Sequence, residues 1–420
     1  EWVINQNLKN CQVHLLKDEG YTPFLYIDIA STDDKSAKNI LMYGHLDKQP
    51  PFFGWSEGLG PYSPVIKDKH LYGRGSSDDG YAIFAAIASI KACQSANWPL
   101  PRIIIMIEAS EESLPDHLEH YVKQLRDGQH LPQPNLIICL DSGCKDYNRL
   151  WVSTNMRGVF NIDVKVSLNK IGLHSGIYGG IVADSFTVLR ALLDRIEDSE
   201  TGKLKDDVFY PKSIPDNRMK EMQEVAKIIG DNIIKGVPFA DNTQPVSKDI
   251  LELIKNNTWG SSLTVTGGDG LPEAETSGNV LRPFTQFRLS FRIPPLVNSK
   301  DCANAVIQKL TTNPPYNAKV EITNLENLDV SDGFNLSNYS TRLDNILNNA
   351  SNRFFETDRK LFGDGGSVPF LNIFAQMFVN SEIVSIGVTG PGSNIHGPDE
   401  SLDMEYCKKE FKKDPKKYVK

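Results

Sequence analysis

The sequence predicts an α/β fold in two parts, in which a helix-covered, largely parallel sheet is interrupted by an inserted α+β domain. Three observations support this prediction. Short runs that are apolar on both faces alternate with helical patterns, a later region alternates with period two, and the first pattern then resumes. At 420 residues the chain is also too long for one ordinary hydrophobic core.

Four runs of strand length define the predicted sheet, at residues 39–43, 102–107, 136–140 and 382–388. Because they are apolar on both faces, we expect them to be buried strands with helices on either side. The alanine-rich stretch 81–93 lies between the first two and predicts a buried helix.

The inserted part begins near residue 158. Residues 159–168 and 284–293 alternate as half-exposed strands do, 300–310 have helical periodicity, and 319–325 predict another strand. Two further helices are expected at 185–196 and 340–355, whereas the charged, proline-containing stretch 197–248 has no clear pattern.

These patterns divide the chain into three ranges. We predict a first part of the larger domain at 1–157, the inserted domain at 158–333, and the second part of the larger domain at 334–420. The lysine-rich stretch 408–420 is interpreted as a solvated chain end.

Composition excludes several classes of protein. The net charge of −8 argues against a nucleic-acid partner, since nucleic-acid binders usually have a strongly basic face, and no apolar stretch is long enough to span a membrane. The six cysteines form no CxxC pair, which favours free thiols in a reducing compartment. No signal-peptide pattern is visible in the given sequence, and we expect a cytoplasmic location.

Polar residues follow each of the four apolar runs. In open α/β sheets the ligand site lies beyond the carboxyl ends of the strands, so these side chains are expected to meet at one edge. Carboxylates gathered at a buried edge resist ionisation unless cations neutralise them, which indicates a metal site. Imidazoles with carboxylates and no thiolates suit zinc, or manganese or cobalt. The residues are His45, Asp47, Glu108, Glu111, Glu112, Asp141 and His396.

Two of the acidic pairs have ordinary alternatives. Asp78 and Asp79 stand just before the predicted helix, where an aspartate taken alone is best interpreted as an N-cap. Glu111 and Glu112 taken alone would be the solvated start of a helix. Their place beside a buried strand end, together with the other strand ends, favours a role in the metal site.

Motifs in order along nearly the whole chain resemble the di-zinc peptidases that include carnosine dipeptidase, aminoacylase, glutamate carboxypeptidase and succinyl-diaminopimelate desuccinylase. The resemblance is strongest to the carnosinase-like dipeptidases. The motifs are Gly44-His45-Leu46-Asp47, Gly73-Arg74-Gly75-Ser76-Ser77-Asp78-Asp79, Glu108-Ala109-Ser110-Glu111-Glu112, Asp141, Gly172-Leu173-His174-Ser175-Gly176, Phe291-Arg292-Ile293-Pro294, Gly365-Gly366-Ser367 and His396.

This resemblance implies a catalytic domain with an inserted lid and dimerisation domain, and two Zn²⁺ ions per chain. It implies that Asp47 orients the imidazole of His45 through its second nitrogen. It also implies that Glu111 is the general base for a water activated by the metals. The implied metal ligands are His45, Asp78 as the bridge, Glu112, Asp141 and His396.

The resemblance also implies a homodimer. His174 would reach the neighbouring subunit's site and stabilise the oxyanion, and Asn279 would face that same site. Arg292 would bind the carboxylate of a small peptide substrate, assisted by Ser367. One departure is that Gly80-Tyr81 stands where the family usually has Lys-Gly after its acidic pair.

Three functions compete at this point. The first is metal-dependent hydrolysis of dipeptides or short peptides, which Asp141 favours because the related deacylases tend to have glutamate there. The second is an N-acyl amino-acid amidohydrolase on the same scaffold. The third, a binding protein that has lost catalysis, is disfavoured because every implied ligand and the base are present.

Overall fold

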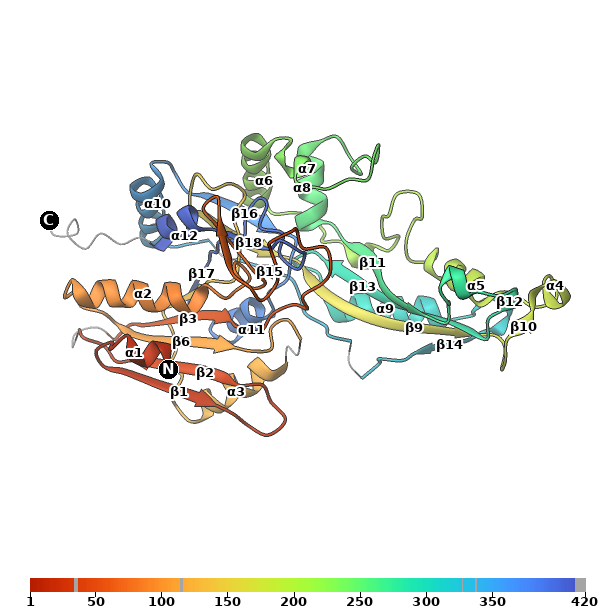
Figure 1. The fold of residues 1–420 in the computed structure, drawn as a ribbon, viewed down its shortest axis with the longest axis horizontal. Coiled ribbons are helices and arrows are strands. Elements are labelled where there is room, and N and C mark those ends of the chain that lie inside the picture. The colour runs from red at the N-terminus through yellow and green to blue at the C-terminus, as the bar shows by residue number, and fades with distance from the viewer. Residues whose placement is uncertain (34–36, 114–115, 327, 337, 412–420) are drawn as a thin grey trace.

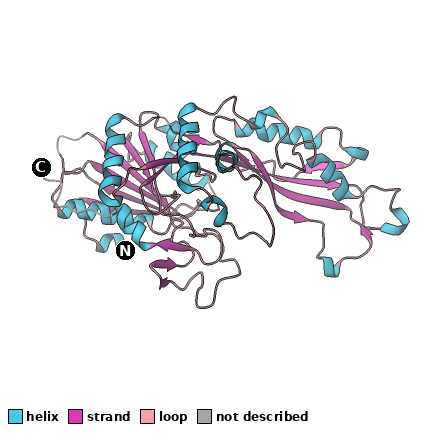
Figure 2. Cartoon of the chain, turned by 90° about the horizontal axis from the view of Figure 1, so that it is seen from above, coloured by secondary structure: helices cyan, strands magenta, loops and turns pink. Residues whose placement is uncertain are grey.

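The computed structural model describes residues 1–33, 37–113, 116–326, 328–336 and 338–411. They form two bodies that lie side by side along the long axis of the molecule (Figures 1 and 2). The larger body is built around a nine-stranded sheet and the smaller one around a four-stranded sheet. Most of the lysine-rich stretch lies outside the described residues.

The larger sheet is parallel at its centre, as predicted. Four central strands run parallel in the order β6-β3-β7-β17, and antiparallel neighbours flank them on both sides. The full order is β1-β2-β6-β3-β7-β17-β8-β15, with β16 also paired to β8. The strands are β1 (Cys11–Leu16), β2 (Phe24–Ile29), β3 (Asn39–His45), β6 (Arg102–Glu108), β7 (Leu136–Cys139), β8 (Trp151–Met156), β15 (Phe334–Asn335), β16 (Lys360–Asp364) and β17 (Glu382–Ser385).

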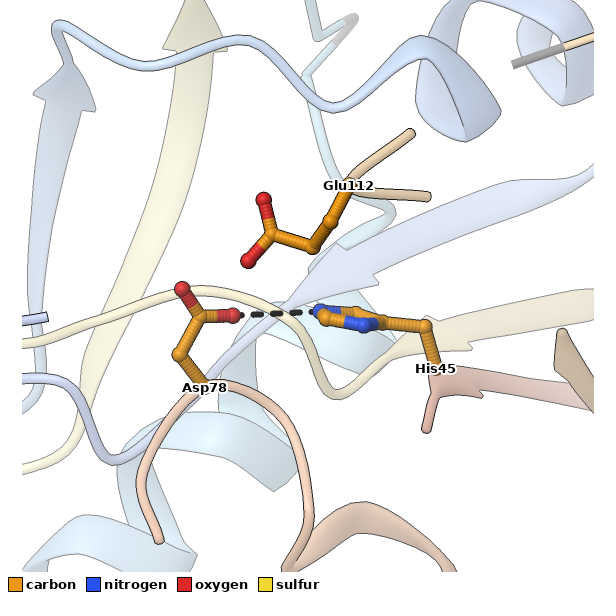
Figure 3. Close-up of side chains that lie close together, drawn as sticks. All are labelled: His45, Asp78 and Glu112. Atoms are coloured by element: carbon orange, nitrogen blue, oxygen red, sulfur yellow. Dashed lines mark hydrogen bonds and ion pairs between the residues drawn. The ribbon is translucent and has the colours of Figure 1, made fainter. Parts of the chain in front are cut away.

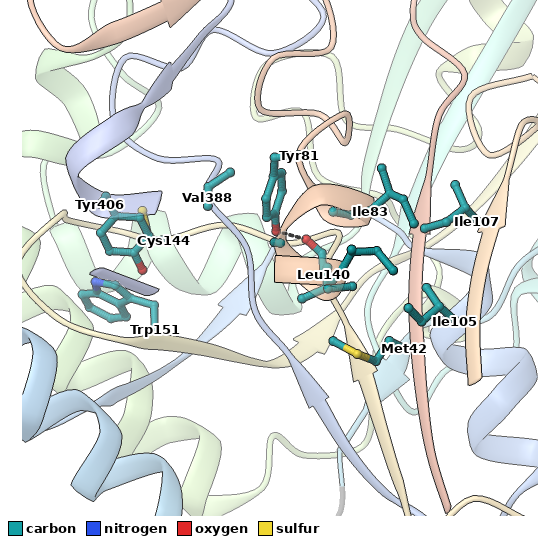
Figure 4. Close-up of a cluster of buried hydrophobic side chains, with 14 of the residues drawn as sticks. Met42, Tyr81, Ile83, Ile105, Ile107, Leu140, Cys144, Trp151, Val388 and Tyr406 are labelled. Atoms are coloured by element: carbon teal, nitrogen blue, oxygen red, sulfur yellow. Dashed lines mark hydrogen bonds between the residues drawn. The ribbon is translucent and has the colours of Figure 1, made fainter. Parts of the chain in front are cut away.

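Helices cover both faces of this sheet. Side chains of β3 alternate between two cores, with Met42 in one and Leu41 and Tyr43 in the other. Figure 4 shows the first core, where Tyr81, Trp151 and other side chains from distant parts of the chain gather. The first core is covered by α2 (Ala82–Ser95), α6 (Asp216–Ile229), α8 (Ile250–Trp259) and α12 (Met404–Phe411); the second is covered by α3 (Asp116–Asp127) and α11 (Pro369–Met377).

Two helices of the predicted insert pack with the larger body. Met222 of α6 and Ile254 of α8 belong to its first core, and α6 contacts β16. We propose that the two domains comprise residues 1–157 with 334–420, and residues 158–333. Within the second of these domains, the stretch 216–259 folds back onto the larger body. The last predicted helix, α10 (Thr341–Phe355), packs on β8 and β17.

The smaller body, which we call the lid, is an antiparallel sheet with helices on one face. In β9 (Gly158–Ser167) buried and half-buried residues alternate, and the buried ones pack against α5 (Ser185–Leu193) and α9 (Ser299–Thr311). The strand order is β11-β13-β9-β14, with β11 (Ser262–Asp269), β13 (Phe284–Ile293) and β14 (Lys319–Ile322).

Short elements complete the structure. At the end of the lid far from the larger body, β10 (Leu173–His174) pairs with β12 (Val280–Leu281) beside α4 (Ser175–Tyr178) (Figure 1). A three-stranded sheet is formed by β4 (Val65–Lys67), β5 (His70–Tyr72) and β18 (Ser401–Asp403). Across the described residues, none of the helices combines the length and apolar character needed to cross a membrane.

Gly44 lies where β3 approaches the start of α2 most tightly. A Cβ at this position would lie 2.5 Å from the Cβ of Ala82 and 2.6 Å from Oδ2 of Asp79. Because Gly44 directly precedes His45, this contact sets how closely the end of β3 approaches the loop before α2.

We therefore expect Gly44→Ala to lower the free energy of unfolding by about 1–3 kcal/mol, because the added methyl group overpacks this contact. Gly60→Ala is the control, since nothing lies within 4 Å of a Cβ at Gly60. Chemical unfolding followed by circular dichroism measures both values. Unchanged stability of the Gly44 variant would contradict the close packing.

Candidate active site

The predicted metal ligands meet at one edge of the larger sheet. His45 is the last residue of β3, Asp141 lies two residues after β7, and Glu112 follows the end of β6. Asp78 lies in the loop before α2, and His396 lies in the loop between β17 and β18. Parallel strands direct their carboxyl ends to the same side of the sheet, which explains why segments far apart in the sequence converge here.

Asp78 lies between two imidazoles and offers one oxygen to each. Its Oδ1 is 3.1 Å from Nε2 of His45, and its Oδ2 is 2.9 Å from Nε2 of His396. The same nitrogen of His396 is 3.2 Å from Oε1 of Glu112. Figure 3 shows His45, Asp78 and Glu112 pointing toward one another. A carboxylate with its two oxygens directed to different partners can bridge two cations.

Two groups of side chains have donor atoms close enough to hold a metal ion. Each group has all its donor atoms within 4.8 Å of one another. Asp141 also reaches His45, with its Oδ1 3.9 Å from Nε2. The donors are imidazole nitrogens and carboxylate oxygens, which suit zinc and similar divalent cations. The groups are His45, Asp78 and Glu112, and His45, Glu111 and Asp141.

Asp47 connects the two strand ends that carry the ligands. Its carboxylate lies 3.4 Å from Nδ1 of His45, which leaves Nε2 directed at Asp78. The same carboxylate accepts the backbone N–H groups of Glu111 at 3.1 Å and Glu112 at 2.9 Å. Burial opposes ionisation of Asp47, but the His45 imidazole and these N–H groups outweigh it and lower its pKa.

The electrostatics of the cluster favour cation binding. Burial raises the pKa of Glu111 well above its ordinary range, and the Asp141 carboxylate raises it further. Burial also raises the pKa of Asp141 to about 7, against the opposing effect of His45. The hydrogen bonds that the His396 imidazole donates to the carboxylates of Asp78 and Glu112 raise its pKa to about 10. In the metal-free site, the protons retained by Glu111, Asp141 and His396 compensate the negative charge that bound metal cations would otherwise neutralise. The residues therefore fit a metal centre.

The adjacent glutamates have different surroundings. Glu112 accepts a hydrogen bond from Nε2 of Gln49 at 2.6 Å and faces His396. Glu111 lies in the other group, with His45 and Asp141. Different environments allow two neighbouring carboxyls to hold different protonation states and to serve different purposes.

A cleft of about 1060 Å³ opens over this cluster, between the larger body and the lid. The cleft is lined by predicted metal ligands of the larger body and by Arg292 near the end of β13. Nη1 of Arg292 donates to Oγ of Ser367 at 2.9 Å, and this hydroxyl donates to the carbonyl of Arg157 at 2.5 Å. Arg292 and Ser367, both predicted to bind the substrate carboxylate, are therefore in direct contact.

Arg157 and Arg292 together form a positive region. Burial lowers the pKa of Arg157 to about 10, and Arg292 lowers it further. Burial likewise lowers the pKa of Arg292, against the attraction of Glu111. No carboxylate of the described residues forms an ion pair with either guanidinium. This end of the cleft therefore suits an anionic group of a ligand.

His174 and Asn279 lie together, but away from the metal cluster. The N–H of Ser175 donates to the carbonyl of Asn279 at 3.0 Å, and His174 pairs with Val280 across the β10–β12 ladder. Both are exposed at the far end of the lid, and neither lines the cleft of its own chain (Figure 1).

The sequence patterns predicted no role in the cluster for four residues that support it. Asp79 is buried and accepts the N–H of His45 at 3.0 Å, and Gln49 binds Glu112. Lys48 donates to the carbonyl of Asp78 at 3.3 Å and lies beside Gly80, where the related peptidases usually have lysine. Glu400 accepts the N–H of Asp78 at 3.2 Å. Asp79 lies inside a predicted motif and Lys48 and Gln49 directly follow another, whereas no sequence signal indicated Glu400.

The chain was compared with known proteins. The model of peptidase family M20/M25/M40 matches residues 41–412. A Cys-Gly metallodipeptidase of Candida albicans is 26% identical over 89% of this chain and 76% of its own length. A human Beta-Ala-His dipeptidase is 24% identical over 91% of this chain and 74% of its own length.

Among solved structures, that of human carnosine dipeptidase 1 superposes with a TM-score of 0.77. It has 20% sequence identity and covers 97% of this chain and 86% of that chain. The likeness shows a shared fold of the whole chain, consistent with the two-body architecture described above. The family match confirms the resemblance drawn from the motifs, and the chain belongs to peptidase family M20/M25/M40.

Proposed function

We propose that this chain is a metal-dependent dipeptidase that hydrolyses the bond next to the free C-terminal carboxylate of a dipeptide or short peptide. The observation that carries the proposal is one cleft that holds both the cluster around Asp78 and Arg292, whose guanidinium forms no ion pair with a carboxylate of the described residues. The dipeptidase names of the relatives from Candida albicans and human support it.

Two divalent cations, zinc or alternatively manganese or cobalt, would be held by the cluster. We assign His45 and Asp141 to one ion and Glu112 and His396 to the other, with Asp78 between them. The ions would lower the pKa of a water and polarise the scissile carbonyl. The nitrogen and oxygen donors, and the paired contacts of Asp78, support this assignment.

Glu111 is the proposed general base. Its half-buried carboxyl lines the cleft beside Asp141, and its backbone is held by Asp47. A carboxylate in this place takes the proton of the attacking water and passes it to the leaving amine. Asp47 would act by holding both the His45 imidazole and the segment that carries this base.

Arg292 and Ser367 are proposed to bind the substrate carboxylate. A guanidinium bonded to a hydroxyl presents several donors that match a carboxylate. Because this pair and the metal ligands line one cleft, the distance between them would limit the enzyme to a bond near the C-terminus. N-acyl amino acids also have such a carboxylate, so the deacylase alternative is separated by substrate tests.

We also propose a homodimer in which His174 and Asn279 enter the partner's cleft. His174 would stabilise the oxyanion there. The far end of the lid exposes several apolar side chains, which monomers seldom expose together. These are Ile171, Ile177, Tyr178, Ile181 and Val280, between 40% and 79% exposed.

A cytoplasmic location is proposed for the protein. None of the six cysteines, all of which lie in the described part of the chain, forms a disulfide, and four of them are buried. Thiols of this kind persist in a reducing compartment.

A substrate panel tests the reaction. We expect dipeptides to be hydrolysed, whereas dipeptide amides, which lack the carboxylate for Arg292, should react about 10–100-fold more slowly.

Glu111→Gln should lower kcat by about 10²–10⁴-fold with metal content unchanged. Release of amino acids is measured by chromatography. Cleavage of acetyl- or succinyl-amino acids without dipeptide cleavage would establish the deacylase alternative, and full activity of the glutamine variant would contradict the mechanism.

Metal removal should destabilise the protein in a pH-dependent way. The raised pKa of Asp141, about 7, and of His396, about 10, mean that the metal-free fold loses stability as pH rises through these values. Metal binding requires deprotonated ligands and strengthens over the same range. Added Zn²⁺ should therefore raise Tm more at pH 8 than at pH 5.5, with two ions per chain by elemental analysis. One ion or none would contradict the proposed centre.

Mixed dimers test whether His174 acts across subunits. Neither Glu111→Gln nor His174→Ala should be active alone. In a dimer of the two variants, one site combines an intact Glu111 with the partner's intact His174, so activity should return at one site. Differently tagged chains are co-expressed, and the mixed dimer is purified through both tags. Absence of recovery would show that His174 acts within its own chain, whereas full activity of His174→Ala alone would show that it has no such role.

A further inference from the structure

A buried ion pair lies behind the metal cluster. Nη1 of Arg74 is 2.7 Å from Oε2 of Glu400, and both side chains are 1% exposed. Neither residue lines the cleft, so neither contacts a substrate there.

Glu400 holds the backbone of the loop that carries Asp78. Its Oε2 accepts the N–H of Gly75 at 2.9 Å, and its Oε1 accepts those of Ser77 and Asp78, each at 3.2 Å. One carboxylate therefore receives three N–H groups within four residues. These bonds therefore set the direction in which the side chain of Asp78 projects from the loop.

Arg74 joins this loop to the two others that carry ligands. Its Nη2 donates to the carbonyl of Gly397 at 2.8 Å, directly after His396. Its Nε donates to the carbonyl of Pro50 at 3.2 Å, in the segment that follows His45. All three loops are thus bonded to a single ion pair.

We infer that the Arg74–Glu400 pair positions the metal centre by setting the spacing of Asp78 with His45 and His396. The side chain of His396 is 49% exposed, and its backbone adopts a left-handed φ of 61°. Little packing therefore fixes this imidazole, and its loop depends on bonds such as that from Arg74 to Gly397. This inference rests on the proposed function, since it concerns the proposed ligands.

A purely stabilising role explains the pair less well. Two charges that are buried lose favourable free energy of hydration, and their mutual attraction regains little more than this loss. A buried ion pair therefore adds little net stability. What the pair supplies here is directional bonding, because its donors and acceptor lone pairs reach backbone groups of three loops at once.

The test is the zinc affinity of Glu400→Gln, measured by competition with a chromophoric chelator. We expect the affinity for at least one of the two ions to fall by about 10–100-fold, the range seen when residues that orient metal ligands are changed. The variant keeps the size of the side chain but replaces one acceptor oxygen by an NH₂ group, which cannot accept the same N–H groups.

Glu221→Gln is the matched control. Glu221 pairs with the buried Arg218 at 2.5 Å in α6, with side chains 15% and 3% exposed. This pair contacts none of the proposed ligands, so its loss should lower Tm and leave zinc affinity unchanged. If Glu400→Gln is recovered only unfolded, Arg74→Met combined with Glu400→Gln replaces it, because no buried charge is then unpaired.

The outcomes separate the inference from the proposed function. If the Tm of the Glu400 variant falls as that of the control does, but its zinc affinity stays within twofold of the wild-type value, the pair serves stability alone. That result overturns the inference. If the wild-type protein itself binds no zinc, the proposed function fails instead. If the wild type binds two ions, and the Glu400 variant but not the Glu221 variant binds zinc more weakly, both the inference and the proposed function are supported.

Discussion

The concentration of carboxylates at one edge of the larger sheet is the constraint on which the rest of the structure depends. The carboxyls are buried beside one another, and burial raises the pKa of Asp79 and Glu111 well above the ordinary range. Such a cluster persists only where positive groups or hydrogen-bond donors oppose it. Imidazoles, backbone N–H groups and the ammonium of Lys48 do so here, and each also holds a ligand segment in place.

Much of the fold could be predicted because buried parallel strands are apolar on both faces and so stand out in the sequence. Among the strands that were missed, β8 lacks this signature. In β8 all six residues are buried, yet Ser153, Thr154 and Asn155 are polar, and this conceals the strand. Helix α6 was missed for a related reason, since its apolar side chains are interspersed with charges, and one of its buried residues is Arg218.

The site could be predicted as far as its residues follow strands or belong to motifs. His45 and Glu112 fall at strand ends, where a polar residue after an apolar run is conspicuous. The supporting contacts could not be predicted, because they join loops that are close only after folding. Glu400 is 322 positions from Asp78 and acts on its backbone N–H, a group that every residue other than proline has. Side-chain identity gives little information about bonds to backbone groups.

The positions of Arg292 and His174 in the lid have different mechanical consequences. Arg292 lies near the end of β13, bonded to Ser367 of the larger body, and Arg157 beside it bonds the carbonyl of Gly365 at 3.0 Å. These contacts lie where the chain enters and leaves the lid. His174 lies at the far end, so any rotation of the lid about this junction displaces it much further than Arg292. In the proposed dimer, substrate binding through Arg292 would therefore persist during lid movement, whereas oxyanion stabilisation by the partner's histidine would require one particular lid position.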